Sequence, residues 1–180
     1  LSPRAVERLR TWTPPWPLPK LFRLTKKGAL NEGLFAGSTI NTPSLLCVED
    51  YLDALAWATS IGGLQALLDR ADANLAVVEA WVEATPWIEL LARERSIRSN
   101  TSVCLELADV VVEGLAAEER STLPRRIADL LDEEGVAFDI SGYRSAPPGL
   151  RLWCGPTVEI DDVKAVLPWL DWAYATALES

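Results

Sequence analysis

The sequence predicts an α/β fold, because helical and strand-like periodicities alternate along the chain. Apolar residues recur at helical spacing over residues 64–82, where Leu64, Leu75 and Val82 share one stripe. Apolar and polar residues then alternate over residues 103–107, which is the periodicity of a half-buried strand. With 180 residues, 49% of them hydrophobic, the chain is long enough to bury a substantial core.

The first element is a short helix that begins at Ser2-Pro3 and runs to about Arg10. Serine is a favoured N-cap residue, and proline is favoured at the first helical position. The helix is followed by a segment that interleaves prolines with tryptophans: Trp12, Pro14, Pro15, Trp16, Pro17 and Pro19. So many prolines exclude a helix or a central strand, and the segment is either pinned to its own domain or an interface arm.

Glycines and polar residues make residues 25–44 mostly loop. A helix is expected to open at Thr42-Pro43 and to run to about Ser60. Gly62-Gly63 interrupts it, and the second helix ends at Pro86.

The pattern beyond Pro86 changes to mixed strands and helices. The expected elements are a strand at 103–107, a helix at 123–131 closed by Gly135, strands at 136–140 and 150–154, and a helix from about Ile160 with Pro168 inside it. We therefore expect a small α/β domain at residues 88–180, which is the part expected to fold independently, and a separate domain segment at residues 1–87.

Composition excludes several classes of function. A net charge of −9 argues against a general nucleic-acid or anionic-membrane surface. The chain has no histidine, which excludes a histidine triad or a histidine zinc site within it. The three cysteines are widely spaced, so we expect no metal site and free thiols in a reducing cytoplasm. No apolar run is long enough for a membrane span or a signal peptide.

Two places have the residues of an anion site. Asn41, Thr42 and Ser44 stand where a helix is expected to begin, and free N–H groups and the helix dipole favour a phosphate there. The alternative is an ordinary N-cap. Arg144 and Arg151 flank a Pro-Pro-Gly turn and suit a carboxylate or phosphate, the alternative being salt-bridging arginines on a surface turn.

Other charged clusters are interpreted as solvated surface. The run with Arg93, Arg95 and Arg98 is typical of a connector, and the acidic runs are typical of exposed helix faces. No pair of carboxylates is placed persuasively for general acid–base catalysis.

Several motifs occur together in one order that resembles the phosphoserine aminotransferase family, in the form found in alphaproteobacteria and some relatives. Each motif alone is weak, but the ordered set is specific and covers essentially the whole chain. The motifs are Phe22-Arg23-Leu24-Thr25-Lys26-Lys27-Gly28, Thr39-Ile40-Asn41-Thr42-Pro43-Ser44, Arg98-Ser99-Asn100-Thr101-Ser102-Val103, the turn from Gly142-Tyr143-Arg144 to Pro148-Gly149-Leu150-Arg151, and Leu167-Pro168-Trp169-Leu170-Asp171-Trp172.

The resemblance implies a class V pyridoxal-phosphate aminotransferase of fold type I. Residues 1–87 would then be the end of the large cofactor-binding domain, with an interface arm and connecting helices, and residues 88–180 the small C-terminal domain. The chain begins at Leu1 and contains no methionine, and we interpret it as the C-terminal half of such an enzyme. The lysine that forms the Schiff base would lie upstream of Leu1.

The resemblance also implies roles for individual residues. Asn41 and Thr42 match the pair that reaches the cofactor phosphate of the other subunit of a homodimer. Arg151 matches the arginine that binds the substrate's α-carboxylate, and Arg144 matches a basic residue near the substrate's phosphate. Tyr143 stands where other branches have histidine, and the turn is one residue longer, so the phosphate contacts depart from the family pattern.

The implied reaction transfers the amino group of L-glutamate to 3-phosphohydroxypyruvate, giving O-phospho-L-serine and 2-oxoglutarate in serine biosynthesis, with a possible further role in pyridoxine biosynthesis. Pyridoxal 5'-phosphate supplies the electron sink. Two alternatives stay open: another class V aminotransferase, such as a serine–glyoxylate type, or a non-catalytic binding domain that reuses the fold. The isolated chain is expected to be inactive without the Schiff-base lysine.

Overall fold

The computed structural model describes residues 1–143 and 145–179, and their contacts divide the chain into two units, residues 1–56 and residues 57–180. The division falls within helix α2 (Leu45–Ser60) and earlier than the predicted boundary at residue 87. That predicted boundary separates the family's large and small domains, and it stays a prediction.

Unit 1, residues 1–56, contains little regular structure before its long helix. Helix α1 begins at Pro3, and its predicted N-cap, Ser2, accepts a hydrogen bond from the Ala5 N–H at 3.2 Å. The proline–tryptophan segment is irregular, as predicted. The elements are α1 (Pro3–Thr11), the antiparallel pair β1 (Thr25–Lys26) and β2 (Ala29–Leu30), two 3₁₀ turns (Lys20–Phe22 and Glu32–Ala36) and α2 (Leu45–Ser60).

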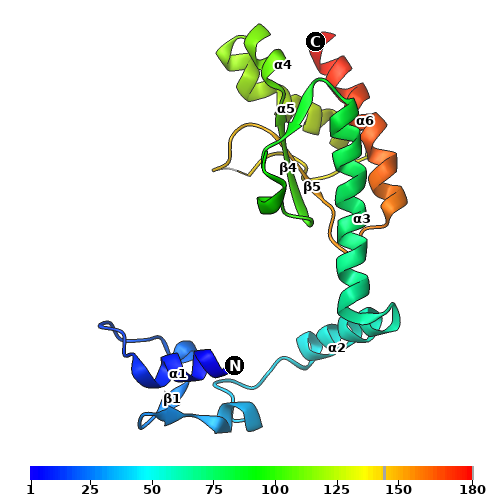
Figure 1. The fold of residues 1–180 in the computed structure, drawn as a ribbon. Helices are drawn as coiled ribbons and strands as arrows, with labels where there is room; N and C mark the ends of the chain where they lie inside the picture. Colours follow the sequence, from blue (N-terminus) through cyan, green and yellow to red (C-terminus); the bar gives the residue numbers. More distant parts are fainter. Residues whose placement is uncertain (144, 180) are drawn as a thin grey trace. The chain divides into compact units, whose positions relative to one another are not determined.

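Unit 2, residues 57–180, is an antiparallel sheet of order β3-β4-β5 with helices packed on it (Figure 1). Helices α3 and α5 contact both the sheet and α6. The elements are α3 (Gly63–Ala84), β3 (Ile88–Leu90), β4 (Ser102–Leu107), α4 (Asp109–Gly114), α5 (Ala117–Glu133), β5 (Leu150–Trp153) and α6 (Ile160–Glu179).

The sheet has one buried face and one open face. Along β4, Val103, Leu105 and Leu107 are buried, whereas the alternate residues are partly exposed. The buried side chains join those of α3, α5 and α6 in one core cluster. This alternation is the strand periodicity on which the sequence prediction depended, and it leaves the open face of the sheet free to carry polar side chains.

Asn74 of α3 is a buried polar residue that fixes the entry to α6. Its Nδ2 donates to the carbonyl oxygens of Cys154, Gly155 and Val158 at 3.0–3.4 Å. These bonds satisfy a buried amide and hold the turn after β5 against α3. Helix α3 is therefore an integral part of unit 2.

Two sequence predictions need correction. Residues 136–140 are not a strand, because the Val136 and Ala137 N–H groups both return to the Leu131 carbonyl, and Asp139 has a left-handed φ of 54°. A strand cannot be regular through such a residue. Helix α2 begins at Leu45 rather than at Thr42-Pro43, and its first turn is closed by Ser44.

Candidate functional site

Arg151 lies on the open face of the sheet. In the antiparallel register of β4 and β5, Arg151 is paired with Cys104, and Trp153 is paired with Ser102. Paired residues project from the same side of a sheet, and their neighbours Leu150 and Leu152 are buried on the other side. The strand thus presents the arginine away from the core, as a ligand-binding residue requires.

The guanidinium of Arg151 meets a carboxylate and an aromatic ring. Its Nη2 donates to Asp139 Oδ2 at 3.0 Å and to the Asp139 carbonyl oxygen at 3.5 Å. The guanidinium carbon lies 5.6 Å from the centre of the Tyr143 ring, a cation–π distance. The structure therefore brings together Arg151 and Tyr143, two of the predicted site residues.

A cavity of about 350 Å³ opens beside this arginine. Its walls combine an aromatic surface with a few polar groups, which is typical of a site for a small ligand. The lining residues are Ser102, Phe138, Asp139, Ile140, Arg151 and Trp153.

Two hydrogen bonds stabilise the loop from Gly142 to Gly149, one across its base and one within it. The Gly142 N–H donates to the Gly149 carbonyl oxygen at 2.9 Å, and the Ala146 N–H donates to the Tyr143 carbonyl oxygen at 2.8 Å. A Cβ on Gly149 would lie 2.1 Å from the carbonyl oxygen of Leu105, so only glycine permits this approach to β4. The loop thereby holds Tyr143 in place and delivers the chain into β5.

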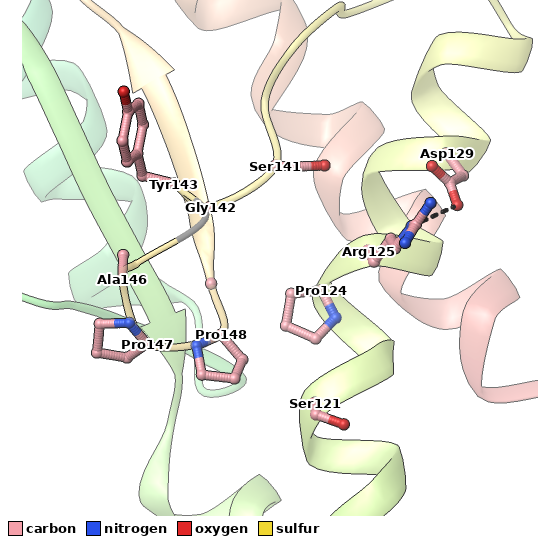
Figure 2. A pocket seen from close by; sticks show the side chains of 11 residues that line it. Ser121, Pro124, Arg125, Asp129, Ser141, Gly142, Tyr143, Ala146, Pro147 and Pro148 are labelled. Carbon is pink, nitrogen blue, oxygen red and sulfur yellow. Dashed lines mark ion pairs between the residues drawn. The ribbon is translucent and has the colours of Figure 1, made fainter.

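A second cavity, of about 380 Å³, lies between this loop and helix α5. Figure 2 shows Ser121 and Pro124 of α5 on one side and Pro147 and Pro148 on the other, with the ring of Tyr143 on the far side of the loop from α5. The predicted residue Arg144 belongs to this loop but lies outside the described residues.

Asn41 and Thr42 belong to unit 1. Both are exposed and precede α2, a helix of 16 residues. The Thr39 hydroxyl donates to the Asn41 carbonyl oxygen at 2.8 Å, and Ser44 Oγ accepts from the Cys47 N–H at 3.5 Å. Short polar side chains before a helix N-terminus are of a kind that suits a phosphate group.

Arg98, the first residue of another motif, has a structural role. Its guanidinium donates to the carbonyl oxygens of Ala92 and Arg93 and to the Glu79 carboxylate, each at 2.8 Å. These bonds hold the connector between β3 and β4. The motif therefore helps build the sheet that carries the site.

A cluster of charges occupies the far part of the open face. Arg93 Nη2 lies 3.3 Å from Glu89, 3.7 Å from Glu106 and 3.3 Å from Asp109. Glu89 and Glu106 are directly paired across β3 and β4, and burial raises the pKa of Glu106 above its ordinary value although Arg93 opposes the shift. Arg93 thus offsets the repulsion between two like charges.

The described residues contain no cluster of side chains suited to a metal ion, and none of their helices is long and apolar enough to cross a membrane. Burial raises the pKa of the Cys154 thiol to about 11, which keeps it protonated and unsuited to nucleophilic chemistry at neutral pH.

Asp139 is the site residue that sequence reasoning missed. The available signal was hairpin pairing across the Gly142–Gly149 loop, because Arg151 donates its N–H to the Ile140 carbonyl oxygen at 2.8 Å. Folding the two flanking segments together in that way places an acidic residue next to the predicted carboxylate-binding arginine.

Curated relatives from two species of Methanosarcina match nearly the whole chain. The phosphoserine aminotransferase of Methanosarcina mazei is 51% identical over 174 residues, which are 97% of this chain and 44% of the relative. The phosphoserine aminotransferase of Methanosarcina barkeri is 52% identical over the same shares. The chain thus spans less than half the length of these relatives. No family model matches it.

Solved structures show the same fold. A phosphoserine aminotransferase from Bacillus circulans subsp. alkalophilus has a TM-score of 0.64 at 17% identity, over 79% of this chain and 36% of that one. A structure from a study of radiation damage of the Schiff base in phosphoserine aminotransferase has a TM-score of 0.66 at 18% identity, over 94% and 41%. With the α/β fold that the sequence predicts, the chain is thus similar to phosphoserine aminotransferases, in sequence over nearly all of its length and in fold over most of it.

Proposed function

We propose that these residues form part of a pyridoxal-phosphate-dependent phosphoserine aminotransferase. The enzyme transfers the amino group of L-glutamate to 3-phosphohydroxypyruvate, giving O-phospho-L-serine and 2-oxoglutarate, and acts as a cytoplasmic homodimer. The observation that carries the proposal is Arg151, which projects from the open face of a rigid sheet beside a cavity and already holds a carboxylate. Both the amino donor and the amino acceptor have an α-carboxylate for such an arginine.

The division of roles follows from the positions of the residues. Arg151 binds and orients the α-carboxylate, with Tyr143 packed against its guanidinium. Asn41 and Thr42, in the segment that precedes α2, would reach the phosphate of the cofactor held by the other subunit of the homodimer. The cofactor, when bound, supplies the electron sink for transamination.

The test uses the full-length enzyme with Arg151→Ala. We expect kcat/KM for both substrates to fall about 100-fold, which corresponds to about 3 kcal/mol for the loss of a charged hydrogen-bonding partner. Arg95→Ala is the control, because Arg95 is an exposed arginine with an ion pair to Glu79 at 3.2 Å. An unchanged kcat/KM in Arg151→Ala would show that the arginine does not bind the substrate.

Recognition of the substrate's phosphate separates this function from that of a serine–glyoxylate aminotransferase. We propose that Arg144 contacts that phosphate. Arg144→Ala in the full-length enzyme should raise KM for 3-phosphohydroxypyruvate while leaving KM for L-glutamate within about twofold, since glutamate carries no phosphate. Equal effects on the two substrates would contradict the assignment.

The isolated 180-residue polypeptide is expected to be inactive. The family resemblance matches none of its four lysines to the lysine that holds the cofactor: Lys20, Lys26, Lys27 and Lys164. Turnover of L-glutamate by the purified polypeptide with added pyridoxal phosphate would contradict this expectation.

A further inference from the structure

The proposed substrate arginine is occupied by a carboxylate of its own chain. Asp139 Oδ2 lies 3.0 Å from Arg151 Nη2. The side chain of Arg151 is 27% exposed, whereas that of Asp139 is 87% exposed. The aspartate therefore reaches the arginine from the solvent side, which is the side from which a ligand enters.

The backbone holds Asp139 in this position. Its φ of 54° lies in the left-handed region, which is uncommon for residues other than glycine and best tolerated by aspartate and asparagine. The hydrogen bond from the Arg151 N–H to the Ile140 carbonyl oxygen joins the segment to β5. An uncommon backbone conformation that turns a charged group toward a binding residue is characteristic of functional sites.

The contact between the two side chains is of a kind that a substrate can replace. Both hydrogen bonds to Asp139 use one nitrogen, Nη2, whereas a free carboxylate can pair with two nitrogens of the guanidinium fork. Because the Asp139 carboxylate is largely exposed, it can turn into water without leaving a buried charge unpaired.

We propose that Asp139 is an internal competitor for the carboxylate site of Arg151. It occupies the arginine while substrate is absent and leaves when the substrate's α-carboxylate binds, so it sets KM without taking part in the chemical step. This proposal rests on the function proposed above, in which Arg151 binds that carboxylate.

The test measures steady-state kinetics of the full-length enzyme with Asp139→Asn. Asparagine adopts the left-handed conformation and keeps the shape of the side chain but removes its charge. KM for L-glutamate and for 3-phosphohydroxypyruvate should both fall about two- to fivefold, the range expected for an ion pair with an exposed partner. The kcat value should stay within about twofold, because the competitor is displaced in the substrate complex.

Asp161→Asn is a closely matched control. The side chain of Asp161 on α6 is 86% exposed, and its Oδ1 lies 3.1 Å from Lys164 Nζ. Its replacement therefore removes a similar surface ion pair outside the site. Both KM values should stay unchanged in this variant. Asp139→Gly is a second test variant, because glycine also adopts the left-handed conformation and removes the carboxylate, and KM should fall again.

The outcomes separate the two proposals. If Arg151→Ala impairs both substrates but the Asp139 variants leave KM unchanged, the competitor role is overturned and the substrate role of Arg151 stands. A rise in KM in the Asp139 variants would make Asp139 a residue that positions Arg151, which also overturns the competitor role. If Arg151→Ala has no effect on either substrate, the role proposed for Arg151 is wrong, and the competitor role of Asp139 is overturned with it.

Discussion

The two units of the chain differ in where their large apolar side chains lie. Every residue of the core cluster belongs to unit 2, between Leu75 and Ala177. In unit 1, by contrast, helix α2 exposes several large apolar residues, among them Leu45, Leu46, Tyr51, Leu52 and Leu55. A soluble protein rarely leaves so many large apolar side chains of one helix in contact with water.

The difference shows that apolar content alone does not tell which part of a chain folds by itself. Unit 2 closes its own core, whereas the large apolar side chains of α2 stay exposed. The matched relatives are more than twice as long as this chain.

The largest expected effect is the difference between separately expressed units. Residues 57–180 should unfold in a single cooperative urea transition followed by circular dichroism, because they contain the whole core cluster. Residues 1–56 should show no such transition. A cooperative transition in residues 1–56 would contradict the comparison.

A shorter piece, residues 88–180, sharpens this test. It lacks α3, which contributes Leu75, Val78 and the buried Asn74 to unit 2. We therefore expect it to lose the cooperative transition, although the strand pattern alone predicts that residues 88–180 fold independently.

The next effect concerns the loop that carries the site. Gly149→Ala should destabilise unit 2 by about 3 kcal/mol, the upper end of overpacking penalties, because the new Cβ would collide with the Leu105 carbonyl of β4. Urea unfolding measures the change. Gly114→Ala is the matched control, since nothing lies within 4 Å of a Cβ there, and its stability should not fall. If the two variants were equally stable, the predicted collision between the new Cβ and the Leu105 carbonyl would not occur, and the loop could not lie so close to β4.

A smaller loss is expected from Asn74→Leu. The variant leaves the carbonyls of Cys154, Gly155 and Val158 without the Nδ2 donor, which should cost about 2 kcal/mol. Asn100→Ala is the control, because Asn100 makes an exposed bond to Asp72 and its loss should stay below about 0.5 kcal/mol. Thermal unfolding measures the loss of stability in each variant, and equal losses would contradict the structural role of Asn74.

The smallest effect lies on the open face of the sheet. The pKa of Glu106 is raised in the folded state, mainly by burial, so its ionised form lowers the stability of the fold above that pKa. Glu106→Gln should therefore raise Tm slightly at pH 7. The gain should vanish below about pH 4.5, the ordinary value for this carboxyl, where the wild-type side chain is protonated in both states. If the Tm advantage of Glu106→Gln instead grew as the pH fell, the pKa of Glu106 would not be raised in the folded state.

Local rules predicted much of the fold. Ser2-Pro3 gave the start of α1, Gly62-Gly63 separated α2 from α3, and Gly135, with φ +68°, follows the end of α5. Strand β3 was missed because three residues are too few to show a period. The false strand at residues 136–140 has the right alternation, but the left-handed Asp139 that breaks it depends on its contact with β5.

The candidate site was predicted in part. The type and position of Arg151 predicted either an anion-binding residue or a salt-bridging one, and the structure shows it in contact with Asp139 and Tyr143. Its pairing with Asp139 depends on tertiary structure, because two segments separated by the 142–149 loop must lie side by side. The binding roles of all five predicted site residues stay predictions: Asn41, Thr42, Tyr143, Arg144 and Arg151.

The hydrogen bond between Gly142 and Gly149 has an evolutionary consequence. It closes the loop at its base, so residues inserted or deleted between these two glycines change the loop without shifting the register of β5. An insertion within β5 itself would turn Arg151 into the core. The placement of Arg151 on the open face is therefore protected from changes in the length of the neighbouring loop, so this loop can vary in evolution while the arginine stays in place.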